Sequence, residues 1–135
     1  MKFIKATLKY TEDQNKERLS LLGVETDNRH GGIEHFENVD ADTLQKLVDK
    51  GYASTYDKQN NAPTLGEFLE FMKHYPEFKA HGYVVSNDRK DRRITVEGLK
   101  GVATEKEAIW DFKDLCEDAD EFECDENGNC FSWWD

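Results

Sequence analysis

The chain has 135 residues and a formal net charge of −11, with 29 acidic and 18 basic side chains. A chain of this length buries roughly two thirds of its unfolded surface on folding, which is enough for one hydrophobic core without metal or disulfide support. Aromatic residues make up 12% of the sequence, and this content excludes a fully disordered acidic chain. We therefore expect a single folded domain over residues 1–135.

The composition also bears on compartment and cofactors. No apolar run reaches the ~18 residues of a membrane-spanning helix, and Lys5 and Lys9 interrupt the amino-terminal segment before a signal-peptide core is complete. The three cysteines, Cys116, Cys124 and Cys130, lack CxxC spacing and nearby histidines. This pattern argues against a secreted disulfide framework and a structural zinc site. We expect a cytoplasmic protein with no membrane segment, metal or cofactor.

Four elements are expected before residue 40. Alternating apolar residues over 4–10 predict a strand with one solvated face. Thr11 and Gln14 have the spacing of a capping box, but the leucines that follow do not keep helical spacing, so a helix and then a strand are expected over 11–24. A short strand is expected over 33–39.

Two helices in the middle of the chain are marked by their ends. Asp40 is suited to cap a helix that runs through Lys50, with Gly51 just past its end. Thr64 and Glu67 have capping-box spacing before an apolar run with helical periodicity.

The next segments predict a hairpin and a further helix. Two β-prone runs over 81–86 and 93–97 are separated by a polar stretch, which favours a hairpin. Thr104 and Glu107 form a third capping box and are expected to open a helix. The predicted fold class is α+β, with about three helices packed on antiparallel hairpins.

Charge is divided unevenly along the chain. Residues 1–103 hold 17 acidic and 16 basic side chains, whereas residues 104–135 hold 12 acidic and 2 basic ones. The second segment also holds six aromatic residues: Trp110, Phe112, Phe122, Phe131, Trp133 and Trp134. Because disordered acidic tails lack aromatic residues, we expect segment 104–135 to belong to the fold. Its charge fits a solvated helix face or an electronegative docking surface.

Asn127-Gly128 predicts a β-hairpin at the carboxyl end, with a two-residue type I′ turn. This loop would place Cys124 opposite Phe131. Cys124 and Cys130 would then point to opposite faces of the hairpin, so we expect free thiols. A five-residue loop, the alternative, would set the two sulfurs side by side.

The same register gives a functional hypothesis. It places Trp134 on the face away from the core, among Glu121, Glu123 and Asp125. We expect a non-enzymatic binding or regulatory protein whose acidic, aromatic surface docks a basic partner protein, with nucleic-acid mimicry as a narrower version. In such an interface the carboxylates would orient the approaching basic partner, and the aromatic side chains would supply most of the binding affinity. The alternative for Trp134 is packing against the body of the fold.

A second hypothesis is nucleic-acid binding through a basic hairpin tip. Its cluster comprises Arg89, Lys90, Arg92 and Arg93. Such a cluster fits a solvated turn, a contact to phosphate, or a contact to an acidic surface such as the chain's own tail.

The run Gly82-Tyr83-Val84 followed by Asp91-Arg92-Arg93 is similar to the wing of MarR-type winged-helix regulators. The resemblance covers residues 82–99 and implies that the tip grips the DNA backbone. A helix-turn-helix joins its helices by three or four residues. Residues 51–63 separate the two helices expected here, which argues against that architecture.

An enzyme whose site is assembled only in three dimensions is the third alternative. The sequence contains neither a G-x-S-x-G run nor a phosphate-binding G-x-x-x-x-G-K run. His30 and His35 flank Gly31-Gly32, which breaks a helix, so we expect loop histidines rather than metal ligands. No catalytic residue is predicted.

Overall fold

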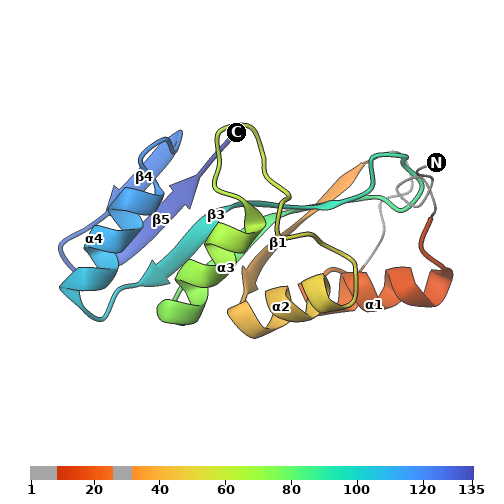
Figure 1. Cartoon of the computed structure of the whole chain (residues 1–135), viewed down its shortest axis with the longest axis horizontal. Coiled ribbons are helices and arrows are strands. Elements are labelled where there is room, and N and C mark those ends of the chain that lie inside the picture. The colour runs from red at the N-terminus through yellow and green to blue at the C-terminus, as the bar shows by residue number, and fades with distance from the viewer. Residues whose placement is uncertain (1–8, 26–31) are drawn as a thin grey trace.

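The computed structural model describes residues 9–25 and 32–135. The helices are α1 (Glu12–Leu22), α2 (Ala41–Asp49), α3 (Leu65–His74) and α4 (Lys106–Leu115). The strands are β1 (Ile33–Val39), β2 (Lys79–Val85), β3 (Ile94–Val102), β4 (Glu121–Cys124) and β5 (Asn129–Trp133). The strands form one antiparallel sheet in the order β1-β2-β3-β5-β4 (Figure 1). The α+β class is confirmed, with four helices in the described ranges instead of about three.

Helix α1 forms because both of its ends are capped. Thr11 and Gln14 make the expected capping box, and Gly23 ends the helix at φ 73° with its N–H bonded to carbonyls of the last turn. The strand expected directly after this helix is wrong, because the helix itself continues to Leu22 and residues 23–25 belong to no strand. The strand expected over 4–10 falls almost entirely outside the described residues.

The caps of α2 and α3 are confirmed, whereas that of α4 is not. Asp40 accepts from the Thr43 N–H at 2.9 Å, and the capping box that opens α3 is complete. Helix α4 begins one residue later than expected, with Glu105 as an N-cap that makes no side-chain bond. Glu107 is then the second helical residue and cannot reach back as a capping box requires. Thr104 instead donates to Glu77 at 3.4 Å.

The central hairpin of β2 and β3 is confirmed, and it contains a bulge between His81 and Gly82. A Cβ on Gly82 would lie 1.9 Å from the carbonyl oxygen of Thr95. Only glycine therefore allows the two backbones to approach this closely.

The core lies between the sheet and the helices, which cover one face of it. Figure 1 shows α1, α2 and α3 along one side of the sheet. Helix α4 joins this layer through Phe112, whose ring centroid lies 5.7 Å from that of Phe71 in α3 and 5.5 Å from that of Phe122 in β4. The four helices of the described ranges leave the other face of the sheet uncovered. Within residues 9–25 and 32–135, no helix has the length and apolar character needed to cross a membrane.

Candidate functional site

The carboxyl-terminal hairpin has a different register from the one expected. Cys124 pairs with Cys130, and Glu123 pairs with Phe131. The expected partner of Cys124, Phe131, is one residue further along β5. The expectation that the two cysteines point to opposite faces is therefore wrong, since directly opposed residues share a face of the sheet.

The turn chemistry of Asp125 explains this register. The Gly128 N–H donates to the Asp125 carbonyl at 3.1 Å, and only Gly128, at φ 85°, has positive φ in the loop. One Asp125 carboxylate oxygen accepts from the N–H groups of Asn127 and Asn129, each at 2.9 Å. Aspartate at the first position and glycine at the fourth are typical of a type I turn, here closed by a left-handed glycine. The loop therefore has three residues instead of two.

Trp134 is consequently buried, and the expectation that it lies on the outer face with three carboxylates is wrong. Its side chain is 1% exposed, and its ring packs edge-on against Phe68 of α3 with centroids 5.5 Å apart. Gln59 donates to the Trp134 carbonyl at 2.9 Å. The alternative considered for this residue, packing against the body of the fold, is confirmed. Glu121, Glu123 and Asp125 remain exposed.

Trp133 takes the outer position that Trp134 was expected to occupy. It lies directly opposite Glu121, as Phe131 lies opposite Glu123. The alternate residues of both strands point toward the helices, as the buried Ser132 does, so these four side chains project from the uncovered face. We call Glu121, Glu123, Phe131 and Trp133 the open-face patch.

A third carboxylate adjoins the open-face patch. The indole Nε1 of Trp133 donates to Glu97 of β3 at 3.3 Å. The same carboxylate lies 3.9 Å from Nδ1 of His35. The tryptophan is thus held by a charged partner on the sheet, and its ring orientation is fixed by a hydrogen bond as well as by packing.

The twelve carboxylates of segment 104–135 are all exposed. The segment folds as α4, β4 and β5, at one end of the molecule's longest axis (Figure 1). Its carboxylates lie on both sides of this end, because Glu107 and Asp114 belong to α4 while Glu121 and Glu123 belong to the open-face patch. Trp110 of α4 is 61% exposed.

A shallow groove of about 250 Å³ adjoins the patch on the same face. His81 stacks on Phe131 with ring centroids 5.1 Å apart, and its Nε2 donates to the Ser132 carbonyl at 2.9 Å. Since a carbonyl only accepts, the proton of the neutral ring lies on Nε2. Burial lowers the pKa of His81, so the ring is neutral near pH 7. The groove is smaller than typical small-molecule sites of ~300–1,000 Å³.

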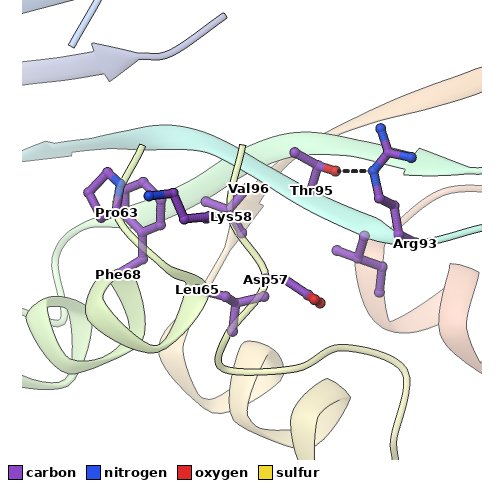
Figure 2. Close-up of a pocket in the computed structure, with 9 residues that line it drawn as sticks. Asp57, Lys58, Pro63, Leu65, Phe68, Arg93, Thr95 and Val96 are labelled. Atoms are coloured by element: carbon purple, nitrogen blue, oxygen red, sulfur yellow. Dashed lines mark hydrogen bonds between the residues drawn. The ribbon is translucent and has the colours of Figure 1, made fainter. Parts of the chain in front are cut away.

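A second pocket lies between the loop before α3 and strand β3 (Figure 2). Its volume is about 70 Å³, which leaves no room for a metabolite. Two cations line the pocket, Lys58 and Arg93. Arg93 donates to Thr95 at 3.2 Å and to Asp91 at 3.1 Å. The pocket therefore offers a strongly engaged guanidinium and no reactive cluster.

The basic tip forms the turn between β2 and β3. Arg89 and Arg93 both pair with Asp91, at 2.7 and 3.1 Å, and the Arg89 guanidinium holds the pKa of Asp91 below its usual value. Arg92 donates to the Asn87 carbonyl at 3.0 Å. The two ion pairs with Asp91 reduce the positive charge that the tip presents to phosphate. The tip lies at the opposite end of the longest axis from α4, so a contact with the chain's own tail is wrong (Figure 1).

No group of three or more metal-binding side chains occurs in the described part of the chain. His35 lies in β1 and not in a loop, while His30 falls outside the described residues. Comparison with family models, curated proteins and solved structures finds no match to this chain.

Proposed function

We propose that this protein is a binding or regulatory protein that docks a basic partner protein through the open-face patch. The observation that carries the proposal is the pairing within β4 and β5, where Trp133 lies opposite Glu121 and Phe131 opposite Glu123. Each aromatic ring thus has a carboxylate as its direct neighbour, on a face that none of the helices within residues 9–25 and 32–135 covers.

This combination suits recognition of arginine. A guanidinium can lie over an indole face, a contact worth roughly 0.5–2 kcal/mol, while it pairs with an adjacent carboxylate. Arginine and large aromatic residues dominate the energetics of protein interfaces. The surplus of carboxylates in segment 104–135, 12 against 2 basic side chains, would raise the rate at which a basic partner arrives.

The proposal is tested by titrating the full chain with a synthetic peptide of alternating arginine and glycine while following backbone amide signals by NMR. We expect the largest changes in β4, β5 and the adjoining part of β3. Glu121→Gln combined with Glu123→Gln should weaken binding about fivefold, from roughly 0.5 kcal/mol for each of two exposed charge contacts.

The matched control is Glu107→Gln combined with Asp114→Asn, which removes the same charge from α4. Equal weakening by both pairs would mean that the peptide senses only net charge, and the proposal would fail. Trp133→Leu keeps an apolar side chain but removes the ring face, so it should weaken binding without a large change in melting temperature. Unchanged affinity in that variant also contradicts the proposal.

A further inference from the structure

Two thiols face each other under α4, on the covered side of the hairpin. Cys124 of β4 and Cys130 of β5 are direct partners, and their sulfur atoms lie 2.9 Å apart. A disulfide bond joins sulfurs at ~2.05 Å. A movement of less than 1 Å would therefore bring the two sulfur atoms to bonding distance.

The backbone around this pair suits a cross-strand disulfide. The Asp125 N–H donates to the Asn129 carbonyl at 3.0 Å, which makes residues 125 and 129 a hydrogen-bonded pair. Antiparallel pairs alternate, so Cys124 and Cys130 form a non-hydrogen-bonded pair, in which the Cα atoms are ~4.5 Å apart. Disulfides span Cα separations of ~4.4–6.8 Å, so no change in register is needed.

The two thiols differ in access. Cys124 is partly exposed, whereas Cys130 is 2% exposed. Burial raises the pKa of both thiols, that of Cys130 to about 12. Since the thiolate is the attacking species, exchange is slow near pH 7 and accelerates as the pH rises. Cys124, the more accessible thiol, is the first to meet a reagent from solution.

We propose that Cys124 and Cys130 are an oxidative modification site, at which a low-molecular-weight disulfide such as oxidised glutathione converts the pair into an intramolecular disulfide. The Cys124 thiolate attacks the glutathione disulfide, forms a mixed disulfide and releases one glutathione thiol. The Cys130 thiolate then attacks the Cys124 sulfur and releases the second. The protein loses two protons and two electrons, and one glutathione disulfide is reduced to two thiols.

A third thiol provides the internal control. Cys116, at the end of α4, is 4% exposed, and burial raises its pKa to about 12. Its thiol interacts electrostatically with both other thiols, but the 2.9 Å contact between sulfur atoms joins Cys124 and Cys130. The structure therefore assigns the bond to Cys124 and Cys130 alone, and Cys116→Ala should oxidise as the natural sequence does.

The experiment incubates the folded full chain with oxidised glutathione at mildly alkaline pH, blocks remaining thiols by alkylation, and measures mass before and after reduction. No lysine or arginine follows Lys113, so trypsin leaves all three cysteines in one peptide. Cleavage at Glu126 separates Cys124 from Cys130. We expect a reducible link between the two fragments in the natural sequence and in Cys116→Ala.

Two single variants make the result decisive. Cys130→Ser should stop at the mixed disulfide on Cys124, and Cys124→Ser should oxidise more slowly because only buried thiols remain. Circular dichroism checks that each variant is folded. A link that involves Cys116, a stable glutathione adduct on Cys124 in the natural sequence, or a link that forms only in denaturant would each overturn the proposal.

Discussion

Replacement of Trp134 by alanine should strongly destabilise the protein. The indole is 1% exposed and packs edge-on against Phe68, and removal of a buried tryptophan costs roughly 3–5 kcal/mol in transfer and cavity free energy. Domains of this size have free energies of unfolding of roughly 5–15 kcal/mol. The variant should therefore retain only part of its stability, although Trp134 lies next to the last residue of the chain.

Urea denaturation followed by circular dichroism measures this effect. With an m-value of ~2 kcal/mol/M, a loss of ~4 kcal/mol moves the midpoint down by ~2 M. Trp110→Ala is the matched control, because this indole is 61% exposed and surface substitutions change stability by only about 0.5 kcal/mol. Equal midpoints for Trp134→Ala and the natural sequence would refute the burial of Trp134 and, with it, the register of the hairpin.

Three further predictions concern proton binding and backbone contact. The hydrogen bond to Asp111 raises the pKa of Tyr75 to about 12. Asp111→Asn should therefore lower the pKa of Tyr75, which a pH titration of phenolate absorbance measures. An unchanged pKa would contradict the hydrogen bond between Tyr75 and Asp111. Burial and the Glu17 hydrogen bond raise the pKa of Tyr52 to about 12 from its usual 10.0. Its contribution to stability is complete below pH 10 and is lost as the pH rises through about 12, so Tyr52→Phe should flatten that decline in denaturation curves. A Cβ on Gly98 would lie 1.9 Å from the carbonyl oxygen of Ser132. Gly98→Ala should therefore lower the free energy of unfolding by roughly 3 kcal/mol. A melting temperature equal to that of the natural sequence would exclude the close approach of the two backbones.

Local signals in the sequence predicted most of the helices and strands. The caps at Thr11, Asp40 and Thr64 mark three helix starts correctly because a side chain near the helix end supplies the bond by itself. Thr104 fails because the chain before α4 packs against Glu77, far away in sequence, and the helix starts one residue later.

The hairpin register was harder to predict because Asn-Gly fits two loop lengths. Asp125, three residues before Gly128, was the signal for the longer loop, since its carboxylate satisfies two N–H groups of the turn. One residue of difference exchanged the faces of both strands, moved Trp134 into the core and brought Trp133 to the surface. The groove beside the open-face patch is lined by residues from β1, β2, β3 and β5. Spacing along the sequence does not predict which residues of four separate strands line one groove.

The elongated fold also separates charge. Residues 88–93, at the tip between β2 and β3, hold four basic and two acidic side chains, while segment 104–135 carries a net −10 at the far end. The molecule is therefore a permanent electric dipole along its longest axis. A cationic body that diffuses toward it feels a torque, which turns the end built from α4, β4 and β5 to the front before any atoms touch.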